Sequence, residues 1–273
     1  MGLTEKIELL GKGLYKNIPD ELTLTSIPTA SELEYVGSED FDSTMINNIL
    51  PNVIVEDIDV KELLEIDYQW ILRALRILNY GPYHTTNGIF CEQCGKILND
   101  GQYIVNLNSI GCKPLPEGFV NDVVISADEF IDFDEDIHIS LLTVQQMLNA
   151  EKDKAFKSKD GRTLRDFARL CYMVKAIGNN SIVTPIDVKF TIQNKFTNAD
   201  YKLLKYRVVE LTDYGLRAGG ETTCPVCGNK KAGFVAIADD RFFRPTVGDL
   251  QRWRDDKRRG RSKNVSRNAS KDV

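Results

Sequence analysis

The sequence predicts an α+β protein in which two cysteine turns close a small sheet and a long segment of mixed strands and helices is inserted between them. Two motifs share the form Cys-x-x-Cys-Gly, at 91–95 and 224–228. Apolar residues recur at helical spacing over residues 60–80. Strand-like alternation of apolar and polar residues follows each of the two motifs. Strands that flank the two turns, with helices gathered between them, are typical of the α+β class.

Residues 1–42 are expected to form an N-terminal arm. This segment contains one short strand candidate, Glu21–Ile27, followed by Pro28 and polar residues. Its apolar residues are too few to form a core of their own, so the arm should pack on the body of the protein or on a neighbouring chain.

The body is expected at residues 43–251 and begins with two helices. A short helix at Thr44–Leu50 should end before Pro51, because the residue before a proline disfavours helical backbone angles. The clearest helix of the chain covers residues 60–80. Its wide apolar stripe marks it as a core helix, and Gly81 with the proline after it supplies its end.

Arg76 lies beside the apolar stripe of this helix, so its guanidinium is expected to reach a carboxylate or carbonyl groups. Asp67 lies about 13 Å away along the helix axis, at about 1.5 Å per residue, which is too far for that partner. We therefore predict a partner from outside the helix. Arg76→Ala should then lower the free energy of unfolding by roughly 1–3 kcal/mol.

The segment between the two motifs is expected to carry strands first and helices afterwards. Its helical part, at about residues 144–211, forms the insertion. Strands are predicted at 102–110, 123–125 and 137–144, helices at 144–156, 163–177 and 198–211, an element of ambiguous type at 188–196, a loop at 215–220 and a final strand at 233–238.

The two motifs predict a structural zinc site and, with it, a zinc-knuckle pair that closes the small sheet. Each pair places two thiolates on one tight turn, and the following glycine tolerates the positive φ that such a turn needs. Two facing turns supply four ligands about 2.3 Å from one Zn²⁺, with no open position for water or substrate. Closing a loop of about 130 residues costs about 2 kcal/mol more than closing a compact zinc ribbon, whereas structural zinc contributes roughly 10–16 kcal/mol in peptides. The predicted ligands are Cys91, Cys94, Cys224 and Cys227.

Other interpretations of the cysteines stay open. A redox pair needs a thioredoxin-like βαβ setting, which neither pair has, and structural disulfides need an oxidising compartment that the first residues do not indicate. Unrelated reduced thiols are a further alternative, and His84 is an alternative ligand in place of one sulfur. Cys112 and Cys171 stand alone in apolar surroundings and are expected to be buried small hydrophobic residues.

Charge is unevenly distributed along the chain. The formal net charge is −5, but residues 252–273 hold nine Lys or Arg and three Asp or Glu, a net +6, which leaves −11 for the rest. We expect a basic, flexible tail on an acidic body. The tail either grips phosphate groups, docks on an acidic surface of its own chain or of a neighbour, or has no specific role.

The acidic run Asp128–Asp136 does not match a calcium loop, because Ile137 and Thr143 stand where an EF-hand needs glycine and glutamate. The run is either a solvated edge or a docking surface for a basic partner. No phosphate-loop, dinucleotide or zinc-protease motif occurs, and two histidines leave few places for a histidine-based triad. We therefore expect a protein that is not an enzyme, and no apolar run is long enough for a transmembrane helix.

One arrangement of residues is similar to that of a known family. Its members are Asp67, Arg76, Tyr80, Gly81, Tyr83, Cys91 and Cys94, and after the second motif Phe242, Phe243, Arg244 and Pro245. This order resembles the tail baseplate hub proteins of T-even-type contractile phages, over about residues 45–110 and 210–246. The arm and the basic tail lie outside the resemblance.

The resemblance implies a non-enzymatic structural or assembly component of a phage tail baseplate hub, stabilised by a structural zinc ion. The implied partners are other baseplate, hub and tail proteins, including the tape-measure protein. The implied location is the virion tail, after synthesis in the host cytoplasm. The alternative is a zinc-ribbon nucleic-acid-binding accessory protein, which the acidity of the body counts against.

Overall fold

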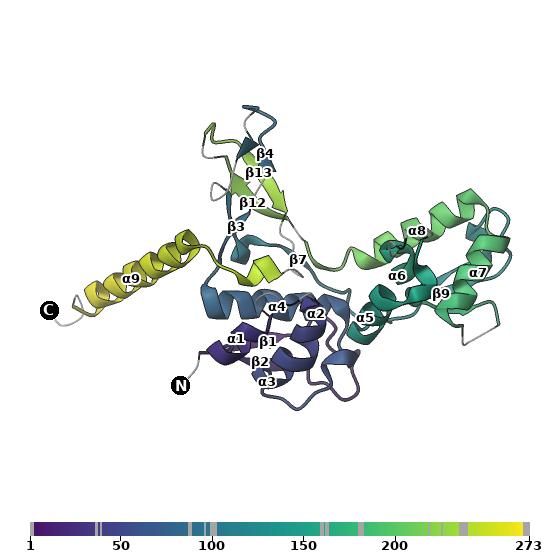
Figure 1. The fold of residues 1–273 in the computed structure, drawn as a ribbon, viewed down its shortest axis with the longest axis horizontal. Coiled ribbons are helices and arrows are strands. Elements are labelled where there is room, and N and C mark those ends of the chain that lie inside the picture. Colours follow the sequence, from purple (N-terminus) through teal and green to yellow (C-terminus); the bar gives the residue numbers. More distant parts are fainter. Residues whose placement is uncertain are drawn as a thin grey trace.

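The computed structural model describes residues 3–35, 38, 40–86, 89–95, 97–98, 103–158, 161, 164–179, 183–217, 219–224, 226–234 and 240–269. A central body is built around helix α4 (Glu65–Tyr80), and a set of β-hairpins rises from it (Figure 1). A lobe of helices and strands lies on one side of this body, and the long C-terminal helix α9 (Val247–Ala269) projects from the other. Mixed helices and small antiparallel sheets confirm the predicted α+β class.

The central body combines the N-terminal segment with α4. Its elements before α4 are β1 (Thr4–Glu8), β2 (Glu21–Thr25), α1 (Thr29–Tyr35), α2 (Phe41–Thr44), a π-helical turn (Met45–Ile49), α3 (Leu50–Val53) and a 3-10 helix (Val60–Glu62). Strands β1 and β2 form an antiparallel hairpin that packs on α4. Strand alternation places Leu22 and Leu24 on one face, where both are fully buried in the main core. The segment expected as an arm is thus part of the core of the body.

Helical structure continues through Pro51, where the first short helix was expected to end. The elements α2, the π-helical turn and α3 follow one another without a break, and Pro51 lies in the first turn of α3. Proline is tolerated in a first turn, and the wider π-helical turn before it makes room for a residue without an N–H donor.

Helix α4 is shorter than predicted at its start and ends where predicted. Leu63 and Leu64 are extended, and Leu64 forms a bridge to Thr143 of the inserted segment. Gly81 ends the helix with a φ of 81°. A Cβ at this position would lie 2.3 Å from the indole of Trp253 in α9, so both the backbone angle and the close approach require glycine.

The inserted lobe lies between β7 (Cys112–Lys113) and β11 (Gly215–Leu216). These two strands pair antiparallel and hold the ends of the lobe together. Most buried residues of the lobe form a second hydrophobic core, which also takes in Leu64 and Ile66 of the body. Helix α5 packs three of its residues into the core of the body: Val144, Met147 and Leu148. Its elements are β8 (Val123–Ile125), β9 (Ile137–Ile139), β10 (Val174–Ile177), α5 (Val144–Lys152), α6 (Arg165–Met173), α7 (Pro185–Lys195) and α8 (Asn198–Thr212), with the three strands in the order β10-β9-β8. Strands β8 and β9 lie in the lobe before residue 144, and its helices begin at Val144 with α5, where the helical insertion was expected to start.

Two element types in the lobe differ from the prediction. Residues 174–177, expected to continue a helix, pair antiparallel with β9 as strand β10, because β-branched Val174 and Ile177 fill the lobe core from a sheet. The strand expected at 137–144 ends at Ile139, because the Thr143 hydroxyl accepts from the Gln146 amide and caps α5. The ambiguous element at 188–196 belongs to helix α7, apart from its last residue.

The basic tail is helical as far as it is described. Residues 252–269 continue α9, where a flexible segment was expected. Thr246 precedes the first residue of α9 and caps it: its hydroxyl accepts from the Asp249 amide, and the Asp249 carboxylate accepts from the Thr246 amide. Helix α9 points away from the inserted lobe (Figure 1), so the described part of the tail does not fold back on the acidic run of its own chain.

Candidate metal centre

The two cysteine motifs lie at the turns of two hairpins. The first connects β4 (Ile89–Phe90) to β5 (Ile97–Leu98), and the second connects β12 (Gly219–Thr223) to β13 (Lys230–Phe234). A third antiparallel pair, β3 (Tyr83–Thr86) with β6 (Tyr103–Asn106), joins this region to the body, and β12 lies against β6. The contact between β6 and β12 brings the two turns to the same end of the hairpin layer (Figure 1).

Each turn is closed by its own backbone. The Gly95 amide donates to the Cys91 carbonyl at 2.8 Å, and the Gly228 amide donates to the Cys224 carbonyl at 2.9 Å. Both glycines have positive φ, 68° and 72°. The matched geometry is what the glycine after each second cysteine predicts, because only glycine adopts such angles without strain.

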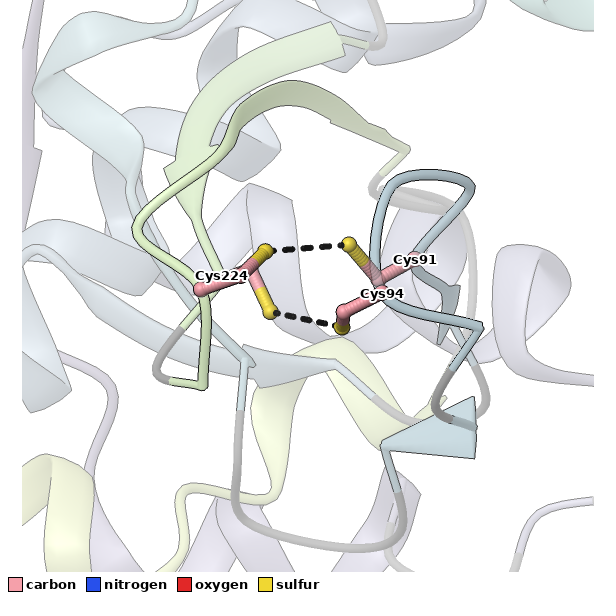
Figure 2. A group of neighbouring side chains, drawn as sticks. Cys91, Cys94 and Cys224 are labelled. Carbon is pink, nitrogen blue, oxygen red and sulfur yellow. Dashed lines mark hydrogen bonds between the residues drawn. The ribbon is translucent and has the colours of Figure 1, made fainter.

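The four sulfur atoms of the two turns form one compact cluster. All four lie within 4.8 Å of one another, so the prediction that the two motifs meet in space is confirmed. Cys91 Sγ lies 3.6 Å from Cys227 Sγ, and Cys94 Sγ lies 3.9 Å from Cys224 Sγ. The sulfurs of the two turns point toward one another across a short gap (Figure 2). A tetrahedral ion with metal–sulfur bonds of about 2.3 Å has sulfur–sulfur edges of about 3.8 Å, and the two distances bracket that value.

Backbone amides favour thiolates at two of the four positions. The amides of Cys94 and Gln93 point at the Cys91 sulfur and lower the pKa of that thiol. In the second turn, the amides of Cys227 and Val226 lower the pKa of Cys224 to about 6. The Asn229 amide acts in the same direction on Cys227, but partial desolvation of its sulfur and hydrogen bonds with the neighbouring sulfurs raise the pKa of Cys227 to about 12. Four thiolates this close repel one another, so a cation at the centre is needed to hold all of them.

The cluster is closed on its inner side and provides every ligand of a four-coordinate site. Cys91 and Cys224 are buried, Cys94 is half-buried and Cys227 is exposed. This donor set leaves no coordination position for a substrate, so the arrangement suits a structural metal rather than a catalytic one.

The remaining candidate ligands lie outside the cluster. The ring of His84 packs on Phe242, with centroids 5.3 Å apart, and His84 is not part of the sulfur group. Cys171 is fully buried in the inserted lobe, and burial raises the pKa of its thiol to about 12, as expected for a small hydrophobic residue. Cys112 is only half-buried. The prediction of a buried small hydrophobic residue is therefore confirmed for Cys171 and wrong for Cys112.

Arg76 joins three segments beneath the hairpin layer. Its side chain is fully buried, and Nε donates to the Phe242 carbonyl at 2.7 Å. Nη1 donates to the Gly81 carbonyl and Nη2 to the Tyr83 carbonyl, both at 2.9 Å. The predicted partner from outside the helix is therefore found, as three backbone carbonyls. Asp67 instead accepts from the N-terminal segment, through Tyr15 Oη and the amides of residues 10 and 11.

Sequence reasoning missed the contacts that anchor α9. The Trp253 indole lies over Gly81, and the Tyr83 hydroxyl donates to Asp256 in a short hydrogen bond. The Asp249 carboxylate is buried and accepts from the Thr85 hydroxyl at 2.7 Å. The sequence did carry one signal for these contacts: Trp253 stands alone within a strongly charged segment. A large aromatic side chain at such a place indicates an apolar contact with another part of the protein.

The acidic run Asp128–Asp136 has no strand structure. Asp128 and Glu129 lie in a 3-10 helix (Ala127–Glu129), and residues 130–136 continue without strand structure until β9. Glu129 pairs with Arg207 and Glu135 with Lys195 within the lobe. The Asp136 carboxylate accepts from the Ala127 amide at 2.7 Å. Part of the run therefore stabilises the lobe itself.

Comparison of the chain with protein-family models, curated proteins and solved structures gave no match. Among the helices formed by described residues, none combines the length and the apolar character needed to cross a bilayer.

Proposed function

We propose that this chain is a non-enzymatic structural or assembly component of a phage tail baseplate hub, stabilised by one structural zinc ion per chain. Zinc is the metal that the donor set favours, because four cysteine thiolates in a tetrahedral arrangement suit Zn²⁺ and fix its coordination completely. In this role the ion makes a zinc-knuckle pair that closes the small β-hairpin layer.

A zinc clamp at this place has a clear mechanical effect. The two turns come from segments that flank the inserted lobe, which is already held at β7 and β11. The ion ties the hairpin β4–β5 to the hairpin β12–β13, so the layer keeps its form without a large core of its own. A rigid, cofactor-stabilised scaffold with projecting parts suits an assembly component.

The observation that carries the tail-assembly proposal is the convergence of the family-like residues on one buried guanidinium. Arg76 donates to the carbonyls of Gly81 and Tyr83, which follow it by five and seven residues, and to that of Phe242, 166 residues away. The bond to Phe242 brings the two regions that the resemblance covers into direct contact. Their contact supports the interpretation of the two matched regions, 45–110 and 210–246, as one structural unit of the hub family.

A nucleic-acid-binding accessory protein remains the second candidate, favoured by the exposed basic side chains of α9. Binding of this kind weakens steeply with salt, because bound lysines and arginines release counterions from the phosphates. Titration of duplex and single-stranded DNA into the zinc-loaded protein at increasing salt discriminates the two functions. Binding that persists at physiological salt favours the accessory role.

The hub proposal is tested in a contractile-tailed phage that encodes this chain. A copy with a peptide tag after residue 273 is supplied during infection, and purified tails are labelled with a tag-specific antibody and imaged in negative stain. Label at the centre of the baseplate is the expected result, and infection without the gene should yield tails lacking complete baseplates. Normal baseplates formed in the absence of the chain would contradict the proposal. A tagged non-virion phage enzyme serves as the control for nonspecific labelling.

A further inference from the structure

Helix α9 is held firmly at its start and projects from the body beyond that point. Asp249, Trp253 and Asp256 recur at a spacing of four and three residues, so they share one face of the helix. This face contacts the body: Asp249 through Thr85, Trp253 over Gly81, and Asp256 through Tyr83. The helix then leaves the body and extends outward (Figure 1).

The opposite face of α9 has a different chemistry. Val247, Leu250, Arg254 and Arg258 follow one another at helical spacing and form this face. Val247 is 72 % exposed and Leu250 39 % exposed, and both arginines are also exposed. Asp249 and Asp256 turn toward the body, and exposed Asp255 lies at the edge of the free face beside Arg258. The free face therefore starts apolar and continues mainly basic. A surface of this kind favours a partner with exposed apolar residues and negative charge, rather than water alone.

The inserted lobe carries a surface of complementary composition. Residues 117–136 contain eight Asp or Glu and no Lys or Arg. Glu129 and Glu135 are used in ion pairs within the lobe, whereas Asp128, Asp132 and Asp134 are exposed. Apolar residues are exposed beside them along the same segment: Val120 68 %, Val124 49 % and Ile131 72 %.

These two surfaces lie on opposite sides of the molecule (Figure 1). Helix α9 contacts α4 and β3 of the body. Residues 117–136 belong to the inserted lobe, where Ile131 and Glu129 bond to α8. Two complementary surfaces on opposite sides of the molecule cannot pair within one chain, but they can pair between copies. We propose that the free face of α9 of one copy docks on the acidic segment 117–136 of a second copy.

The proposed contact is head-to-tail, because it joins two different surfaces of the same chain. Such an interface repeats from copy to copy and closes into a ring or continues as a filament, depending on the rotation between neighbours. A second copy fits the observations better than nucleic acid does. Val247 and Leu250 find apolar counterparts in Val124 and Ile131, whereas a phosphate backbone offers only charge to them. The inference goes beyond the tail-assembly role, and its test needs no phage.

The test measures the mass of the zinc-loaded full chain by sedimentation velocity and light scattering. At about 0.1 M salt the weight-average mass should rise above 30.9 kDa with protein concentration. At about 1 M salt, where the Debye length falls to about 3 Å, it should return to that of the single chain. A wild-type chain that stays monomeric at every concentration and low salt would overturn the proposal.

Charge reversal identifies the two surfaces. The α9 variant combines Arg254→Glu with Arg258→Glu, and the lobe variant combines Asp128→Lys with Asp132→Lys. Each variant alone presents two surfaces of like charge, so each should remain monomeric where the wild type associates. An equimolar mixture should associate again, because each reversed surface then meets an opposite one.

A matched control carries the same change of charge elsewhere, at Lys16→Glu with Lys61→Glu, and should associate like the wild type. Zinc content and melting temperature of all variants should match those of the wild type, since every changed side chain is exposed apart from Lys61, which is half-buried. Association that survives in either single variant, or a mixture that stays monomeric, would show that these surfaces are not the partners. Loss of DNA binding in the α9 variant without any change in self-association would assign the helix to nucleic acid instead.

Discussion

Replacing Arg76 tests how the body of this protein is held together. The guanidinium donates one hydrogen bond to each of three carbonyls: those of Gly81 and Phe242, in buried bonds, and that of Tyr83, in a half-buried one. These groups belong to the end of α4, to β3 and to the segment before α9. Arg76→Ala leaves all three acceptors without this donor and removes the aliphatic part of the side chain from the core.

The expected loss of stability is larger than for a single orphaned group. An unsatisfied buried acceptor costs about 1–3 kcal/mol, and each lost methylene about 0.8 kcal/mol. Water entering the gap and local collapse will recover part of this sum, as they do at other disrupted buried charges, where about 3–5 kcal/mol is lost. We expect a decrease of about 3–5 kcal/mol in the free energy of unfolding. For a domain of this size that corresponds to a melting temperature lower by about 6–20 °C.

The assay is thermal and urea unfolding of the zinc-loaded protein, followed by circular dichroism and calorimetry. Helix α4 belongs to the core of the body, which also includes Val144, Met147 and Leu148 of α5. Arg76→Ala should therefore lower the transition in which this core unfolds. The matched control is Arg73→Ala on the same helix. Arg73 is half-buried, donates to a single carbonyl, that of Leu107, and should cost only about 1 kcal/mol. An Arg76→Ala protein that melts like the wild type, or no earlier than Arg73→Ala, would refute the reasoning.

Two further predictions concern the metal and the response to pH. Cys91→Ser should lose the zinc ion and several kcal/mol of stability. The control variant Cys112→Ser should retain about one zinc per chain, as measured by elemental analysis. A wild-type protein that is fully folded without metal would contradict the site. Burial raises the pKa of Asp42 from near 3.8 to about 6, so the folded state holds this proton more tightly than the unfolded state. Stability contributed by the protonated carboxyl is present below about pH 4 and is lost as pH rises through about 6, by up to about 3 kcal/mol. Unfolding from pH 4 to 7 should show this decline in the wild type and not in Asp42→Asn, while parallel curves for the two proteins would rule it out.

The candidate metal ligands could be predicted from the sequence because their chemistry is local. A Cys-x-x-Cys-Gly turn fixes the direction of two sulfurs within five residues, and few arrangements other than a shared metal use two such turns. Helix α4 was predictable for a similar reason, since its apolar spacing repeats over many residues and its end requires the positive φ of Gly81. Arg76 was recognised as needing an external partner from its place beside the apolar stripe alone.

Tertiary structure decided the features that depend on distant parts of the chain. Residues 174–177 became a strand because β9 offered pairing partners, which outweighed a helical pattern. The N-terminal hairpin became part of the core because α4 provides the surface that buries Leu22 and Leu24. The basic segment became a helix because Trp253 found a glycine to pack on and Asp249 found Thr85. Local periodicity and turn chemistry are written in short stretches of sequence, whereas these contacts join residues tens to hundreds of positions apart, and no local pattern encodes which surfaces will meet.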